Sequence, residues 1–449
     1  MGRPGRLGLC LLAVLFVAFF AVTMERQVLR DGRQGDLDVF LRAAWAARTG
    51  ADLYQATDDH GWHYLYPPLF ATLLTPLADP PAEVPDSART AVLPYAASAA
   101  IWYWLNVFFL ALALHVLASA LERKAAAGAA MAVPRYSRAW WALRIWPLLA
   151  VLVPAGTSLG IGQSTIIVLL LLCLSAAGLL RGRRLRCGFW LGFAGILKLF
   201  PLYLLIYPLW RRDGRMLLGA AAGLCLGLAI PVAAMGPAAG FHAYRTFLEQ
   251  RLLGEAEGHG NAAVTEELHG TNSQIQSFEY ILYNSLHPIR DARAEVPPKG
   301  YFVAHIVVSV LLSLAVLAFM RRRGDQLSDL LFLAALALLM VPILPVSRPH
   351  YYALGAVAVA GLLSAEWPRH RGLWPGWRTM LAAAASAAAG LLAAAGQHQA
   401  VDLGLASLAA LWLAATALVA ARRRGAEQAE PREERIAAGL AIAAAALYG

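Results

Sequence analysis

Long apolar runs with few or no charges recur along the chain, and they constrain its fold more than any other feature. A helix of about 17 to 25 such residues crosses a hydrocarbon core about 30 Å thick. Only 15% of the residues are charged, whereas an ordinary soluble domain has about 25%. The sequence therefore predicts an all-α, polytopic integral membrane protein with one membrane domain over residues 1–449. The clear runs lie at residues 8–24, 94–119, 142–157, 164–180, 216–236, 301–320, 327–345, 351–365, 377–396 and 403–421.

These runs predict about 10–12 transmembrane helices, some of them short or re-entrant. The shorter Ala-rich run at 436–448 fits either a full span or an interfacial tail. The first run, which follows Arg3 and Arg6, is interpreted as an uncleaved anchor rather than a signal peptide. It leads into Thr-Met-Glu-Arg without the small-x-small pattern of a cleavage site.

Basic residues fall mainly on one side of the predicted spans. The short loops RGRRLR and RRRGDQ carry the clearest excess of Lys and Arg, which is typical of cytoplasmic loops. The N-terminus is then cytoplasmic, and the long loops 25–93 and 237–300 face outward. The net charge of +10 is thus a topology signal, and we expect no nucleic-acid partner. The four cysteines are scattered and predict neither a disulfide framework nor a zinc site.

The segment at 187–210 has basic clusters at both ends but is too short to cross twice. A pair of half-helices that bends near Lys198 and Pro201 and returns to the same side would explain this pattern. A plain tilted span that violates the charge rule at one loop is the alternative. An ionisable residue within a membrane segment is a candidate functional residue. A phosphate would compensate the Lys198 ammonium, unless this side chain snorkels to an interface.

The stretch GDLDVFLRAAWAARTGADLY at 35–54 predicts a short helix over 37–49 that stops at Gly50. Asp36 stands where an N-cap carboxylate would bind free backbone donors, so a structural role is one interpretation. Asp38 stands four residues before Arg42, which is the spacing of a helix-surface ion pair. Asp36 has no such nearby partner at helical spacing, so a catalytic role is the other interpretation.

The stretch YLYPPLFATLLTPLA at 64–78 predicts a short helix that begins at paired prolines. Its apolar part is too short to span a bilayer, so we expect an interfacial helix, with Trp62, Tyr64 and Tyr66 at headgroup depth. A buried helix in a soluble outer domain is the weaker alternative.

The remaining notable polar side chains lie in three further segments that this topology also places outside, and together they predict a pocket between helices. Gln163 and Asn272 could instead be helix caps or interhelical contacts, and His350 could be a satisfied interfacial histidine. These candidates are Gln163, Asn272, Gln274, Arg348 and His350.

Taken in order, these segments resemble glycosyltransferase family 87, the polytopic mannosyltransferases of the GT-C superfamily. The resemblance runs to about residue 365. It is carried by DLDVFLRAAWAARTGADLY, YPPLFATLLTPLA, GQSTIIVLLLLCL, RLRCGFWLGFAGILKLFPLYLLIYPLWRR, TNSQIQSF and SRPHYYALGAV. It implies a GT-C fold, a polyprenyl-phosphate-linked sugar donor, and a catalytic Asp in the first outer loop. By its spacing to Val39 and Phe40, the family's Asp falls on Asp36, although this sequence adds Asp38 and has Phe40 where Tyr is common.

The resulting hypothesis is a glycosyltransferase that moves a hexose, mannose by resemblance, to a hydroxyl of a glycolipid or glycan acceptor. The resemblance implies inversion at the anomeric carbon, and we place the enzyme in the plasma (inner) membrane of a bacterium with its site on the outer face. Asp36 would be the general base. No cofactor and no essential metal are expected, because no acidic cluster with metal-ligand spacing accompanies Asp36. The substrate-binding residues expected are Lys198, Gln163, Asn272, Gln274, Arg348, His350, Tyr66 and Asp38.

Two other classes of function stay open. A transporter or flippase of lipid-linked sugars would also need polar groups within the membrane, although such proteins usually carry repeated halves, and none is visible here. A non-catalytic scaffold predicts that replacing Asp36 or Lys198 changes only stability.

Overall fold

The computed structural model describes most of the chain, and every structural statement below refers to these residues. They are residues 3–25, 35–85, 87, 89, 92–127, 133–249, 275–289, 292–294, 297–321, 324–370, 376–394 and 404–424. Within them the regular structure is helical, and one isolated β-bridge joins Thr57 and His63. The predicted all-α fold is therefore confirmed. The predicted run at 436–448 lies outside the described residues.

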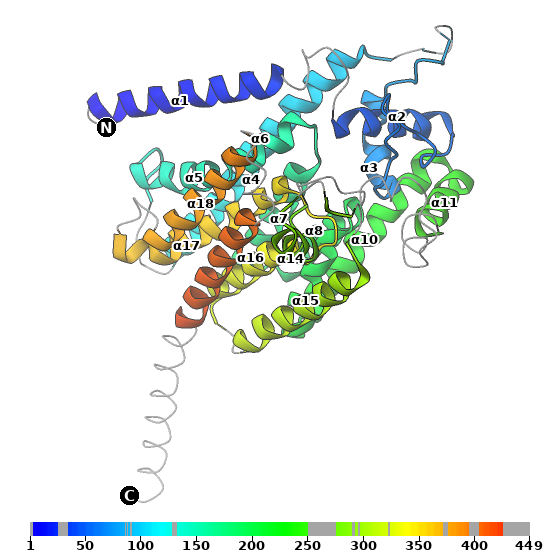
Figure 1. The fold of residues 1–449 in the computed structure, drawn as a ribbon. Coiled ribbons are helices and arrows are strands. Elements are labelled where there is room, and N and C mark those ends of the chain that lie inside the picture. The colour runs from blue at the N-terminus through cyan, green and yellow to red at the C-terminus, as the bar shows by residue number, and fades with distance from the viewer. Residues whose placement is uncertain are drawn as a thin grey trace, which may run out of the picture.

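The helices follow the chain order shown in Figure 1. They are α1 (Arg3–Met24), α2 (Asp36–Thr49), α3 (Pro68–Leu73), η2 (Thr75–Leu77), α4 (Tyr95–Ala127), α5 (Arg138–Ala150), α6 (Leu152–Gly160), α7 (Thr165–Leu180), α8 (Arg184–Leu197), η4 (Phe200–Leu205), α9 (Ile206–Arg211), α10 (Gly214–Met235), α11 (Pro237–Thr246), α14 (Phe278–Leu286), α15 (Lys299–Phe319), α16 (Gln326–Ile343), η7 (Pro349–Gly355), α17 (Ala356–His370) and α18 (Trp377–Ala394). A further helix covers Leu405–Arg424.

Among the described residues, five helices are long and apolar enough to cross a membrane, and a sixth span results if α5 and α6 are counted as one bent pair. The five are α4, α10, α15, α16 and Leu405–Arg424, and the bend between α5 and α6 is 61°. The sequence predicted a larger number. The difference arises because several apolar runs form helices of fewer than 18 residues, such as α7, or break into short pieces, as at 187–210.

Helix α2 covers Asp36–Thr49 and ends at Gly50, which has the left-handed φ of 76° that glycine adopts without strain. The helix and its stop are as predicted. The N-cap is Gly35 rather than Asp36, and no side chain caps this end. The Asp36 carboxylate is therefore not engaged in capping α2.

Helix α3 also begins at the predicted prolines, with Pro67 as its N-cap. Its residues Pro68 to Thr72 are buried, and it packs against α2, α8 and α10. The helix therefore contacts protein on most sides, and its depth relative to a membrane stays a prediction. Tyr64 is fully buried, and its hydroxyl donates to the Pro67 carbonyl and accepts from the Ala71 amide. The apolar stretch is held inside because the neighbouring helices supply a core that the loop alone does not have.

The segment from Arg184 to Arg211 forms a hairpin whose two ends lie close together. Helix α8 ends at Lys198, whose backbone is extended, and η4 and α9 lead back. The guanidinium groups of Arg184 and Arg211 lie 3.4 and 3.2 Å from the carboxylate oxygens of Asp329 on α16. The two arms thus begin and end at one carboxylate, with Lys198 near the bend. Insertion of this hairpin into a bilayer stays a prediction.

Small residues allow α8 and α10 to pack closely along their length. A Cβ atom added at Gly188 or Gly192 would collide with backbone atoms of α10, and one added at Gly219 or Gly223 would collide with backbone atoms of α8. Close approach of this kind gives membrane helices strong van der Waals contact. This packing holds α8, the first arm of the hairpin, in place and thereby positions Lys198 at the end of α8.

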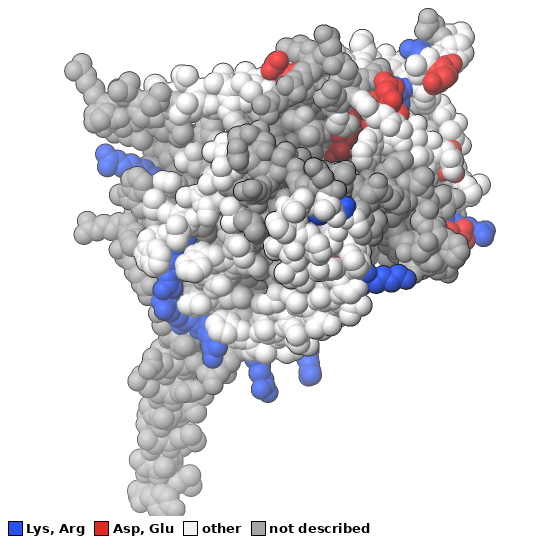
Figure 2. Space-filling model, in the orientation of Figure 1, with Lys and Arg blue, Asp and Glu red and all other residues white. Residues whose placement is uncertain are grey.

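The charges on the visible face are segregated (Figure 2). Acidic side chains lie on the upper and right parts of this face, and its lower left and bottom edges carry basic side chains alone, although further basic side chains lie at the left, centre and right. Positive charge at one end of a helix bundle is typical of the cytoplasmic side of a membrane protein.

Candidate functional site

A cavity of about 450 Å³ lies where four separate segments of the chain meet. The segments are the start of α2, the loop before α3, the turn between α6 and α7, and the start of η7. Polar side chains from all four segments face it, together with apolar and aromatic side chains. The lining residues are Gly35, Asp36, Val39, Phe40, Asp58, His60, Trp62, His63, Leu65, Tyr66, Thr157, Ile161, Gln163, Arg348, Pro349, His350 and Tyr351.

A close backbone contact positions Asp36 in this wall. Gly35 has a φ of 110°, and a Cβ atom there would lie 3.0 Å from the Ile161 carbonyl oxygen. The Leu37 amide donates to the same carbonyl at 3.3 Å. A side chain at position 35 would meet both backbone strain and this contact. The start of α2 is therefore docked on the turn that carries Gln163.

Gln163 bridges the predicted base and the predicted cation. Its Nε2 donates a short hydrogen bond to Asp36 Oδ2, and its Oε1 accepts from Lys198 Nζ at 2.9 Å. The Tyr66 hydroxyl also donates to Oε1, at 3.0 Å. Two donors on Oε1 fix the orientation of the amide, because the reversed amide would face the ammonium with its own donors. Asp36, Gln163, Lys198 and Tyr66 thus form one connected group.

Lys198 lies behind this wall rather than in it. The side chain is buried, and Nζ lies 4.5 Å from the centroid of the Tyr66 ring and 4.6 Å from that of Tyr351. Phe200 adds a third ring at 5.7 Å. Aromatic faces stabilise a desolvated ammonium. Three aromatic rings therefore surround the amine, and Gln163 separates it from the cavity.

The cavity contains charges of both signs. Burial raises the pKa of Asp36 above its ordinary value, while the Gln163 hydrogen bond and the positive charges of Arg348 and Lys198 act in the opposite direction. The negative charge of Asp58 adds a further small increase to the pKa. The net effect is a pKa above that of an exposed aspartate, so the Asp36 carboxylate is a stronger base than an exposed one.

Arg348 and His350 form another part of the wall. Arg348 is half-buried and forms no ion pair within the described part of the chain. His350 is buried, and its Nε2 has no hydrogen-bond partner there. Burial and the nearby Lys198 and Arg348 charges lower the pKa of His350 well below its ordinary value, so the ring is neutral. The wall thus offers one guanidinium and one neutral imidazole.

A small loop at 57–63 contributes residues that the sequence analysis did not include among the candidates. The Asp58 carboxylate accepts from the backbone amides of His60 and Trp62, at 2.9 and 2.8 Å. The bridge between Thr57 and His63 closes the turn. Asp58, His60, Trp62 and His63 all line the cavity. The dense polar and aromatic run TDDHGWHY was the signal that could have identified them.

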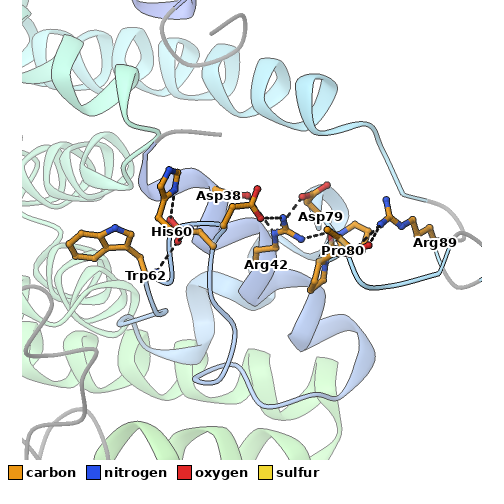
Figure 3. Close-up of polar contacts among 11 residues, drawn as sticks. Asp38, Arg42, His60, Trp62, Asp79, Pro80 and Arg89 are labelled. Carbon is orange, nitrogen blue, oxygen red and sulfur yellow. Dashed lines mark hydrogen bonds and ion pairs between the residues drawn. The ribbon is translucent and has the colours of Figure 1, made fainter. Parts of the chain in front are cut away.

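Asp38 does not line the cavity but belongs to a buried ion cluster (Figure 3). Arg42 Nε lies 3.6 Å from Asp38, Arg42 Nη2 lies 2.8 Å from Asp59, and Nη1 donates to the Pro80 carbonyl at 2.5 Å. Asp79 is a further partner of Arg42, at 3.8 Å. The pair at the expected spacing is therefore formed, but it is buried, because the loop after α2 folds over it.

Most of the predicted site residues thus meet at one cavity. Five of them line it: Asp36, Tyr66, Gln163, Arg348 and His350. Lys198 does not line the cavity but donates a hydrogen bond to Gln163, which does. Asn272 and Gln274 lie outside the described residues. In the part of the chain that the structure describes, no group of three or more His, Cys, Asp or Glu side chains is placed to hold a metal ion.

Comparison with known proteins gives one family match. The family described as glycosyltransferase family 87 matches residues 64–345, more than half of the chain. This range includes Tyr66, Gln163 and Lys198, begins after Asp36 and ends before Arg348. No significant match was found among curated proteins.

Similar solved structures include two of ArnT from Cupriavidus metallidurans. The one described as bound to undecaprenyl phosphate has 15% identity and a TM-score of 0.40, and the alignment covers 91% of this chain and 76% of ArnT. The apo structure has 16% identity and a TM-score of 0.32, with 94% and 78% covered.

Proposed function

Because the chain belongs to glycosyltransferase family 87, we propose that the cavity is the active site of a membrane glycosyltransferase with a polyprenyl-phosphate sugar donor. The sugar is a hexose, mannose, and the acceptor is a hydroxyl of a glycolipid or glycan on the outer face. The arrangement of Asp36, Gln163 and Lys198 supports this proposal more than any other observation. It provides a carboxylate in the cavity wall, an amide that orients it, and a positive charge behind both.

Asp36 is the proposed general base. A hydroxyl becomes a good nucleophile when a positioned carboxylate takes its proton, and such catalysis contributes about 10²- to 10⁴-fold. The raised pKa of Asp36 makes this carboxylate a stronger base than an exposed one. Gln163 limits that rise and holds the carboxylate in one orientation.

The transfer is written as a single displacement. The acceptor oxygen forms a bond to the anomeric carbon while the bond from that carbon to the phosphate oxygen breaks. The bonding electrons leave with the polyprenyl phosphate, and the acceptor proton passes to Asp36. The configuration at the anomeric carbon is inverted. The leaving group is already an anion, so it needs positive charge more than a proton.

Arg348 is the proposed direct phosphate ligand, because a guanidinium binds phosphate oxygens in a bidentate manner and this one faces the cavity. His350 can donate one hydrogen bond from its neutral ring. Lys198 acts at longer range, since Gln163 lies between its ammonium and the cavity. The part of the wall formed by Asp58, His60 and Trp62 is proposed to bind the sugar. Its polar side chains suit the sugar hydroxyls, and its aromatic side chain suits the apolar face of the sugar ring.

The test measures transfer of labelled mannose from a polyprenyl-phosphate-mannose donor by membranes that contain Asp36→Asn. We expect transfer to fall by about 10²-fold or more. The amide keeps the size of the carboxylate but does not accept the proton. A wild-type rate in Asp36→Asn would remove this residue from the mechanism.

Asp38→Asn is the matched control, because it changes the second acid of the same helix at a position outside the cavity. We expect a less stable protein whose rate per folded molecule is retained. The opposite result, with Asp38→Asn inactive and Asp36→Asn active, would assign the base to the other acid. Passage of the labelled donor across vesicles without a new glycosidic bond would favour a flippase instead.

A further inference from the structure

A second cavity lies at the opposite end of the helix bundle from the candidate active site. It measures about 380 Å³ and is bounded by α4, α7 and α8. The first cavity lies at the end of α8 near Lys198, whereas this one lies at the start of α8 and the end of α7. Its lining residues are Val116, Leu174, Ala177, Gly178, Arg181, Arg183, Arg186, Phe189 and Trp190.

Three arginines line this cavity. Arg181, Arg183 and Arg186 are exposed and form no ion pair with any residue that the structure describes. Their neighbour Arg184 does, with Asp213 at 3.6 Å and Asp329 at 3.4 Å. Partial loss of contact with solvent and the positive charges of Arg123, Arg183 and Arg186 lower the pKa of Arg181. The cavity therefore concentrates positive charge that no acidic side chain in the described part of the chain neutralises.

The other walls of this cavity are apolar and aromatic. Val116 belongs to α4, a helix long enough to cross the membrane, and Leu174 and Ala177 belong to the buried helix α7. Phe189 and Trp190 are half-buried on the first turns of α8. An inorganic anion would gain nothing from these walls. An amphiphile with an anionic head and hydrocarbon chains would contact both the arginines and the apolar side chains.

We propose that this cavity binds the headgroup of an anionic phospholipid in the cytoplasmic leaflet. The phosphate lies between Arg181, Arg183 and Arg186, and the upper part of an acyl chain lies along Val116 and Leu174. Arginine suits phosphate because its planar group donates two parallel hydrogen bonds. Basic pockets between membrane helices on the cytoplasmic side are known to bind such lipid heads. The site is separate from the proposed glycosyl transfer and does not depend on it.

The test uses the full chain in neutral detergent, titrated with short-chain phosphatidylglycerol, phosphatidylcholine or inorganic phosphate. Bound lipid is counted by native mass spectrometry. We expect one phosphatidylglycerol to be retained preferentially. The variant R181Q/R183Q/R186Q should bind it at least about tenfold more weakly, since each basic side chain near an anionic lipid contributes measurably to affinity.

The matched control is R215Q/R321Q/R423Q, which removes three exposed arginines on the same predicted side that do not line the cavity. It should bind phosphatidylglycerol as the wild type does. A second variant, Val116→Trp, keeps every charge but fills the apolar wall, and it should also lose the lipid. An unchanged far-UV circular dichroism spectrum and an unchanged unfolding midpoint show that each variant is folded.

Three results would overturn the proposal. The first is equal loss of lipid in both triple variants, which would indicate diffuse surface charge. The second is unchanged binding in Val116→Trp or in R181Q/R183Q/R186Q. The third is displacement of the lipid by inorganic phosphate at similar concentration, which would assign the cavity to a free anion.

Discussion

Asp329 and Asp36 are both enclosed by helices, but their nearest partners differ. Asp329 contacts two guanidinium groups, those of Arg184 and Arg211. Among the residues that the structure describes, no cation forms an ion pair with Asp36, and an amide separates it from Lys198. Asp329, which is buried, therefore contacts cations directly, whereas Asp36, which is half-buried at the cavity, contacts an amide.

The difference indicates how a buried acid is used. A buried carboxylate in direct contact with arginine is held in place by its ion pair, and breaking such a pair is costly. Such contacts suit a structural junction, and Asp329 joins both arms of the hairpin that carries Lys198. A carboxylate held by an amide keeps its orientation and much of its basicity. The contrast supports a reactive role for Asp36 and a structural one for Asp329.

The largest expected effect is on stability at the junction. Asp329→Asn would remove the carboxylate that Arg184 and Arg211 share, leaving Arg184 with Asp213, and breaking a buried ion pair costs about 3 to 5 kcal/mol. Thermal or denaturant unfolding in detergent measures the loss. Asp36→Asn should change stability far less while abolishing transfer. Similar destabilisation by both variants would break the comparison.

Arg348→Gln tests the positively charged part of the wall of the candidate active-site cavity. Loss of a charge-assisted contact to phosphate should weaken binding of the polyprenyl-phosphate donor by about 10- to 100-fold, or about 1.5 to 3 kcal/mol. Donor titration in the transfer assay measures this change as a higher KM. Arg215→Gln, an exposed arginine outside both cavities, is the control. Equal KM values for the two variants would remove Arg348 from phosphate binding.

Gly188→Ala tests the packing that holds the outgoing arm of the hairpin. The added methyl would meet the Met216 carbonyl, and overpacking of this kind costs about 1 to 3 kcal/mol. The measurement is the unfolding midpoint in detergent. Gly214→Ala is the matched control, since nothing lies within 4 Å of its added Cβ atom. If both substitutions leave the midpoint unchanged, close contact between α8 and α10 does not hold this arm.

The smallest expected effect is a shift in pH dependence. Transfer requires ionised Asp36, so it should fall as the pH decreases through the raised pKa, at higher pH than an ordinary aspartate would give. Gln163→Ala removes a hydrogen bond that lowers this pKa, and should move the acid limb of the profile to still higher pH. The profile of kcat against pH measures it. A shift to lower pH would contradict the role of Gln163.

Features set by local chemistry could be predicted from the sequence. Helix 36–49 and its stop at Gly50 follow from propensity and the left-handed glycine. The break at Lys198 follows from the proline after it and from basic residues at both ends. Assigning each loop to one side of the membrane then predicted that four polar residues lie together, and the structure places them at one cavity. They are Asp36, Gln163, Arg348 and His350.

Features set by tertiary contact could not be predicted. The burial of Tyr64 and α3 depends on helices far away in the chain, which apolar periodicity does not reveal. The Arg42 cluster forms because Asp59 and Asp79 come back over α2, so an apparent surface pair became buried. The lining role of Asp58 and Trp62 depends on a turn closed by one isolated bridge.

The hairpin from Arg184 to Arg211, whose two ends both contact Asp329, determines the position of the Lys198 amine. Its two arms share one anchor, so their residue count sets how far the amine reaches toward Gln163. One extra residue in a single arm would rotate the bend and carry the amine away from the amide. Natural variants should therefore keep both arm lengths, or change them together, even where the side chains along them differ.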